Sequence, residues 1–265
     1  MWSRSASTSF VALVAFVTWA MGCRCDGSPT PPPPPSDACQ PLANEPGETL
    51  YPINAPRDVK LEVHTLGRPP RRRLRYAFAA GTRFSFEVLP IQDETDRGDA
   101  DGMTILVEGN VACRARDGSS RLDYRLGLRG VLQDGARAYA ILDHRGFVRE
   151  GGLLATVPVD ARGVTHPREG MPVQLPDEPV GEGAVWTVGR TLDSGVRQNT
   201  TFEVTKLDGD RVETKVHIEA TMPSGASASP GAGRASIELN RPVSTGWFLL
   251  EGADGARAGL RVVPR

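Results

Sequence analysis

Hydrophobic and polar residues alternate along most of the chain from about residue 57 onward. In one run, "RVETKVHIEA" (211–220), Val212, Val216 and Ile218 would point to the same face of a strand. An alternation with a period of two is typical of strands with one buried face, and such strands belong to antiparallel sheets. The pattern therefore predicts an all-β domain over 57–265, with no amphipathic helix. Similar runs are "LRYAFA" (74–79), "RFSFEV" (83–88) and "RLDYRLGLRGVL" (121–132).

Turn signals recur between these runs. Asp-Gly is a strong cue for a tight hairpin, because a hairpin turn needs residues that accept a positive φ. Strands joined in this way predict an antiparallel β-sandwich or an open β-barrel. The Asp-Gly pairs stand at 101–102, 117–118, 134–135, 208–209 and 254–255, and "DHRG" at 143–146 is a further turn.

The domain also carries a faint internal repeat, which predicts two related meanders with halves at 57–165 and 180–265. "GTRF" (81–84) and "GAVW" (183–186) each place an aromatic residue three positions after a glycine, and each leads toward a similar hairpin. The alternative, which we favour, is chance resemblance, because any two alternating hairpins look alike.

A stretch rich in proline and glycine, "MPVQLPDEPVGEGAVW" (171–186), separates the two halves. It predicts a rigid crossing between sheet segments, with Trp186 as a core anchor in the next strand. Asp177 and Glu178 are adjacent carboxylates, but neighbours in an extended chain point in opposite directions. They are therefore poor candidates for paired acid–base chemistry.

The first 22 residues have the organisation of a signal peptide. Their apolar segment, "FVALVAFVTWAM" (10–21), is shorter than the about 20 residues that span a bilayer. "AMGC" (20–23) resembles the lipobox of bacterial lipoproteins, which implies an acyl anchor such as palmitate on Cys23. The alternative is ordinary secretion with cleavage after Ala20.

A proline-rich spacer, "SPTPPPPPS" (28–36), follows the lipobox. Each proline fixes φ and removes a backbone donor, so the run favours an extended polyproline II rod over a helix or a central strand. We therefore assign 23–56 to the lipidated cysteine and a Pro-rich flexible stalk, with the membrane as a partner through the lipid. By resemblance to bacterial lipoproteins, Arg24 after the cysteine implies the outer membrane, facing the periplasm or the cell surface.

Export would place the cysteines in a compartment where disulfides form. If Cys23 is acylated, three remain. A bridge from Cys25 to Cys39 would have to fold back around the proline rod, which strains it. A Cys39–Cys113 disulfide is the better pairing, and the alternative is that both thiols are free.

The composition limits the classes of function. Lys plus Arg (31) nearly balances Asp plus Glu (32), so overall charge gives no argument for binding nucleic acid. Aromatic residues make up only 6% of the chain, which predicts a modest hydrophobic core.

Together with the lipobox and the Pro-rich stalk, three segments resemble a family of uncharacterised bacterial lipoproteins common in myxobacteria-like genomes. They are "LRYAFAAGTRFSFEV" (74–88), "LPDEPVGEGAVW" (175–186) and "TTFEVTKLDGDRVE" (200–213). The resemblance extends over about 73–250 and implies an outer-membrane envelope location and β-structure. It carries no activity to any residue of this chain.

The residues that usually carry chemistry are scattered. The four histidines have no metal-ligand spacing, and no Gly-x-Ser-x-Gly motif is present. In the acidic loop that begins at 93, Asp99, Asp101 and Glu108 match three positions of a calcium loop. Arg97 stands where the first carboxylate is needed, so a solvated hairpin loop is the preferred interpretation. We expect no metal and no cofactor.

The sharpest positive patch is "RPPRRRLRY" (68–76), with Arg71, Arg72, Arg73 and Arg75 as weak candidates for anion binding. The planar fork of arginine suits phosphate groups, including those of lipids. The alternative, which we favour, is a solubilising entry to the domain.

The sequence therefore predicts a non-enzymatic envelope lipoprotein that serves as a structural or binding module. Its partners would be the membrane, a lipid or another envelope protein, and not nucleic acid. The alternative is a carrier that holds a lipid or a lipoprotein acyl chain inside a concave sheet. A carrier needs a pocket of several hundred Å³ with apolar walls, for which this modest core leaves few residues to spare.

Overall fold

The structure, a computed structural model, describes residues 38–52, 59–95, 104–128, 136–156, 172–191, 195–227, 230–251 and 257–265. The predicted signal peptide, Cys23 and the proline run lie outside these ranges. Within them the regular structure consists of β-strands, and no helix occurs. The prediction of an all-β, antiparallel fold is confirmed.

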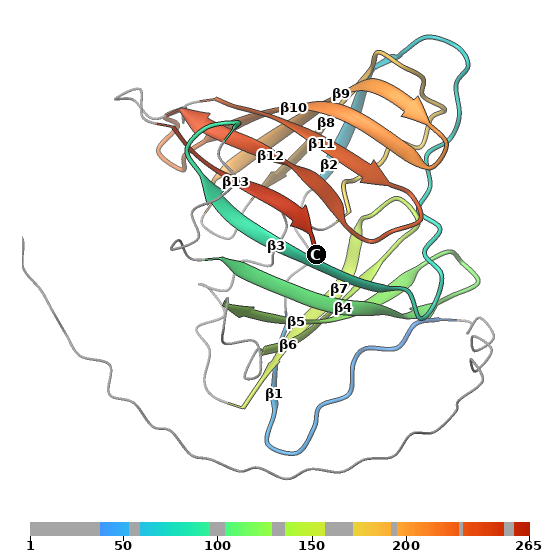
Figure 1. Cartoon of the computed structure of the whole chain (residues 1–265), viewed down its shortest axis with the longest axis vertical. Helices are drawn as coiled ribbons and strands as arrows, with labels where there is room; N and C mark the ends of the chain where they lie inside the picture. The colour runs from blue at the N-terminus through green and yellow to red at the C-terminus, as the bar shows by residue number, and fades with distance from the viewer. Residues whose placement is uncertain are drawn as a thin grey trace, which may run out of the picture. The chain divides into compact units, whose positions relative to one another are not determined.

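The thirteen described strands form one open antiparallel sheet, with β1 and β2 at its two edges (Figure 1). Of the two predicted arrangements, the strands thus form one continuous sheet and not the two sheets of a sandwich. The order across the sheet is β1-β7-β6-β5-β4-β3-β13-β12-β11-β10-β9-β8-β2. The strands are β1 (Thr49–Pro52), β2 (Lys60–Leu66), β3 (Arg83–Ile91), β4 (Ile105–Arg114), β5 (Ser120–Leu128), β6 (Ala136–Leu142), β7 (Val148–Ala155), β8 (Ala184–Thr191), β9 (Arg197–Asp208), β10 (Arg211–Thr221), β11 (Gly231–Glu238), β12 (Ser244–Glu251) and β13 (Arg257–Pro264).

The predicted turns join strands that pair with each other. Asp117–Gly118 connects β4 to β5, and Asp208–Gly209 connects β9 to β10. Both glycines have a positive φ, of 82° and 50°. The "DHRG" turn at 143–146 joins β6 to β7. The other Asp-Gly pairs lie outside the described residues, in connections between strands that are also paired.

Two successive meanders make up most of the sheet. One runs from β3 to β7 and the other from β8 to β12, and β13 joins β12 to β3. A glycine with a positive φ precedes each meander, Gly81 at 84° and Gly183 at 78°. The N–H of Gly81 donates to Val111 in β4, and that of Gly183 donates to Val204 in β9. Each of these glycines thus bonds to the second strand of its own meander.

The alternating run 74–79 is not a sheet strand, and in this respect the prediction was wrong. Its side chains do alternate, because Leu74, Tyr76 and Phe78 are buried in the main core. Its backbone, however, is shared between two hairpins. The N–H of Tyr76 donates to His144 in the β6–β7 turn, and the N–H of Ala77 donates to Leu239 in the β11–β12 turn. An extended chain produces the same two-residue period whether or not it joins a sheet.

The predicted crossing before β8 packs beside this segment. Val180 forms an isolated bridge with Arg72, and the N–H of Leu175 donates to Arg145 in the β6–β7 turn. Trp186 then enters β8 fully buried, as expected of a core anchor. Its Nε1 donates to the Gln174 carbonyl at 3.0 Å, and its ring stacks on that of Phe202.

The sheet domain includes residues 38–52, which the sequence analysis assigned to the stalk. β1 is an edge strand of the sheet and pairs with β7 in antiparallel orientation. Cys39 and Leu42 pack on a small second core formed by Ala115, Tyr139, Ile141 and Leu154. β1 has only four residues, so hydrophobic and polar residues do not alternate over a length that would predict a strand.

Candidate functional site

A cavity of about 160 Å³ lies against the face of β8–β13 that carries the main core, which we call the inner face. The β6–β7 turn and the crossing segment at 172–174 close its other side. Most of the described side chains around it are apolar. They include Val188, Phe202, Val216, Phe248, Leu260 and Val262.

Small residues in the middle of β11 and β12 make room for this cavity. Ala235 and Gly246 face each other directly in the sheet and both line the space. Gly246 has a φ of 149°, and a Cβ there would lie 2.1 Å from the carbonyl oxygen of Arg234. No side chain is compatible with that approach, so β12 cannot fill the space from this position. The gap therefore follows from the local backbone and does not require a large apolar core.

Several polar side chains also line the cavity. Arg190, Gln198 and Thr200 lie on the adjacent strands β8 and β9, and Gln174, Ser244 and Thr245 line it from the crossing segment and from β12. Arg190 follows Val188 by two residues and so shares its face. Its Nε donates to Oε1 of Gln198 at 2.9 Å, which orients the guanidinium plane. Arg234 also contributes to the lining, but it is exposed and alternates with Ala235 along β11, so its side chain belongs to the other face.

The arginine cluster is largely engaged with the protein itself. Arg71 donates through Nε and Nη2 to the Gly67 carbonyl, at 2.9 and 2.7 Å. Arg72 donates to the carbonyl of Gly209. Arg73 is exposed. Three of the four candidates, including Arg75, thus bond to protein acceptors, which favours a structural role over anion binding.

Arg75 ties the buried run to the crossing segment. Its Nη1 donates to the Pro176 carbonyl at 2.9 Å, and its Nη2 contacts the Asp177 carboxylate. Burial lowers the pKa of its guanidinium, while the charge of Asp177 opposes that shift. Arg75 thus links the run 74–79 to the crossing segment, and both of these segments lie outside the strands of the sheet.

The calcium candidates do not form a site among the described residues. Asp99 and Asp101 lie outside the described ranges. Glu108 lies in β4, where its Oε1 is 3.3 Å from Nη1 of Arg265. No group of three or more His, Cys, Asp or Glu that could hold a metal ion occurs in the part of the chain that the structure describes.

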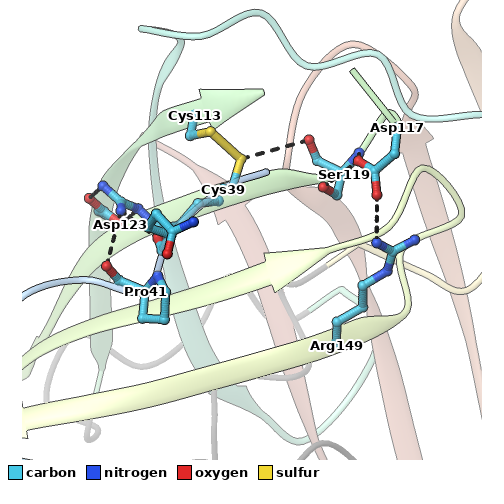
Figure 2. The surroundings of a disulfide bond; sticks show 9 residues. Cys39, Pro41, Cys113, Asp117, Ser119, Asp123 and Arg149 are labelled. Atoms are coloured by element: carbon cyan, nitrogen blue, oxygen red, sulfur yellow. Dashed lines mark hydrogen bonds and ion pairs between the residues drawn. A yellow bond between two sulfur atoms is a disulfide. The ribbon is translucent and has the colours of Figure 1, made fainter. Parts of the chain in front are cut away.

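Figure 2 shows the disulfide between Cys39 and Cys113, the pairing favoured from the sequence. It fastens the N-terminal segment to β4, with the Cα atoms 5.8 Å apart. Arg121 supports the same segment, since its Nη1 donates to the Gln40 carbonyl at 2.6 Å. Disulfides persist in oxidising compartments, so this bond indicates an extracytoplasmic location.

Ion pairs hold the N-terminal segment farther along its length. Nη1 of Arg137 in β6 lies 2.5 Å from Oε1 of Glu45 and 2.9 Å from Oε2 of Glu48. The Glu48 side chain is only 7% exposed, so this pair is well shielded from solvent. The segment is therefore covalently and electrostatically fixed to the sheet face opposite the main core.

The β4–β5 turn beside the disulfide is organised by Asp117, whose carboxylate accepts from the Ser119 hydroxyl and backbone N–H (Figure 2). Nη1 of Arg149 donates to the same carboxylate at 2.7 Å. The Ser119 bonds, followed by the contact with Arg149, lower the pKa of Asp117 to about 2.

We expect the Asp117 carboxyl to titrate in NMR with a midpoint near pH 2, below its ordinary value of 3.8. Because the folded pKa is depressed, the stabilisation is present above about pH 4 and is lost as the pH falls through 2. The site is open to solvent, so Asp117→Asn should cost less than about 1 kcal/mol. Ser119→Ala and Arg149→Gln should each raise the midpoint, and a midpoint unchanged by both variants would contradict this account.

No helix in the described ranges has the length and hydropathy needed to cross a membrane. Comparison with protein families, curated proteins and solved structures finds no match for this chain.

Proposed function

We propose that this protein is a non-enzymatic, extracytoplasmic binding module that holds an apolar group in the cavity beneath β8–β13. An acyl group on Cys23 would tether it to the outer membrane, as the lipobox resemblance and the family resemblance imply. The observation that carries the proposal is the apolar lining of a space that the sheet leaves unfilled.

The volume limits the size of the ligand. Apolar cavities of about 150 Å³ stay dry and bind benzene or xenon. At about 160 Å³, the present cavity suits a ring or a short chain. A pocket for a drug-sized ligand is several hundred Å³, so a carrier that encloses whole acyl chains is less well supported. The terminal part of such a chain remains a suitable occupant.

The position of the described N-terminal segment is compatible with this role. The N-terminal segment lies over Tyr139 and Ile141, at the face of β6 opposite the main core, whereas the cavity lies against the inner face of another part of the sheet. The described N-terminal segment therefore does not cover the cavity. This arrangement supports a module displayed at the membrane.

Binding of 1-octanol and benzene tests the proposal, with the full chain carrying Cys23→Ala so that no lipid is attached. We expect both ligands to shift the NMR signals of the lining residues in a saturable manner. Val216→Phe, which adds a ring at the cavity wall, should weaken binding at least tenfold because it removes volume.

Val63→Phe is the matched control, since Val63 is half-buried in the edge strand β2 and does not line the cavity. It should leave both affinities within about twofold. Val216→Ala should act in the opposite direction and admit a longer chain. The proposal fails if neither ligand binds, or if the two phenylalanine variants weaken binding equally.

A further inference from the structure

One buried hydroxyl group on the wall of the cavity receives no hydrogen bond. Ser244 begins β12 and lines the cavity, and the residue is only 5% exposed. It pairs across the sheet with Ile237, which belongs to the main core, so the Ser244 side chain also lies on the inner face. Its Oγ forms no hydrogen bond of good geometry with any described residue.

The neighbouring tyrosine does not supply the missing hydrogen. The hydroxyl of Tyr76 interacts with Ser244, but it donates its single hydrogen to the Val173 carbonyl, at an O–O distance of 2.9 Å. A backbone carbonyl can only accept, so in the contact with Tyr76 the serine can only be the donor. The Ser244 oxygen therefore remains an unmatched acceptor, and a buried polar atom without its bonds costs free energy.

The open space of the cavity lies beside this oxygen. Gly246 follows Ser244 by two residues on the same face of β12 and lines the cavity without a side chain. Alternate residues of a strand are about 6–7 Å apart. A ring that occupies the space over Gly246 would therefore place a substituent next to Ser244.

We infer that the ligand is a small neutral compound with an apolar ring or short chain and one hydroxyl or N–H group, which donates a hydrogen bond to Oγ of Ser244. This inference rests on the proposed function and adds to it the polar group by which the ligand is recognised. A neutral group fits the site, because a charged one would lose its hydration against a mostly apolar wall. Alcohols, phenols and aromatic amines share this chemistry.

Toluene, phenol and aniline test the inference, because these rings are nearly equal in size and carry a methyl, a hydroxyl or an amino group. Calorimetry on the full chain with Cys23→Ala measures the three affinities. We expect phenol and aniline to bind within about tenfold of toluene. A cavity without a polar partner would disfavour them by roughly a hundredfold, because their polar groups would be buried without a bond.

Ser244→Ala should weaken the binding of phenol and aniline about tenfold and change that of toluene by less than about twofold. Ser236→Ala is the matched control. Ser236 is also a buried serine, on the adjacent strand β11, but it does not line the cavity, and its hydroxyl donates to Glu213 at 3.2 Å. This variant should leave all three affinities within about twofold of the parent.

The outcomes separate this inference from the function on which it rests. Rejection of phenol and aniline by the parent, or equal losses of phenol affinity in the Ser244→Ala and Ser236→Ala variants, would overturn the donor group and leave the apolar cavity standing. No binding of any of the three rings by a protein that circular dichroism shows to be folded would overturn both.

Discussion

Replacing Trp186 with alanine is expected to lower the free energy of unfolding by about 3–5 kcal/mol. The side chain is fully buried and is among the largest in the core. Its removal leaves a cavity, ends the stacking on Phe202 at a centroid distance of 5.4 Å, and leaves the Gln174 carbonyl without its donor. The last loss matters because the bond to Gln174 fastens the crossing segment to β8.

Urea unfolding followed by circular dichroism measures this loss without relying on the fluorescence of the deleted residue. Trp186→Phe is the informative partner, since it keeps a ring but removes the N–H, and it should cost less than the alanine variant. Trp247→Ala removes a half-buried tryptophan from β12 and should also cost less. A loss below about 1 kcal/mol for Trp186→Ala would show that the crossing does not depend on this anchor.

Removing the disulfide should lower the free energy of unfolding by about 4 kcal/mol. Cys39 and Cys113 are 74 positions apart, so the bond closes a long loop in the unfolded chain and reduces its entropy. In the folded protein the same bond keeps the N-terminal segment over Ile141 and Leu154. The loss should therefore be accompanied by faster hydrogen exchange in β1.

The comparison uses Cys39→Ser/Cys113→Ser against the oxidised parent, with Cys23→Ala and Cys25→Ala in both proteins so that no other pairing forms. Urea midpoints give the difference. A reductant should bring the parent to the level of the variant and leave the variant unchanged. Equal midpoints for the oxidised parent and the double variant would contradict the prediction.

The effect on the binding site distinguishes these two predictions. The disulfide lies at the face opposite the main core, so its loss should reduce stability while 1-octanol binding in the remaining folded protein is kept. Trp186 contacts Phe202 and Gln174, which both line the cavity, so Trp186→Ala should impair both stability and binding.

Local information in the sequence determined most of the strands and their turns. The period of two in runs such as 83–88 and 211–220 reports which side chains face the core, because each strand presents alternate residues to it. Asp-Gly at 117–118 and 208–209 determined hairpins through a backbone preference of neighbouring residues. The pairing of Cys39 with Cys113 was favoured by elimination among few cysteines.

Tertiary structure alone decided how the extended segments are used. The run 74–79 has the alternation of a strand, yet its N–H groups bond to two separate hairpins, and no local pattern distinguishes those partners. The sequence predicts a surface patch of arginines near it, whereas Arg72 and Arg75 donate to carbonyls far away in the chain. The cavity arises because the small residues Ala235 and Gly246 pair across β11 and β12. Arg190 lines the same cavity from β8. Small residues look unremarkable along a chain, and only the register that places them opposite each other leaves a space between them.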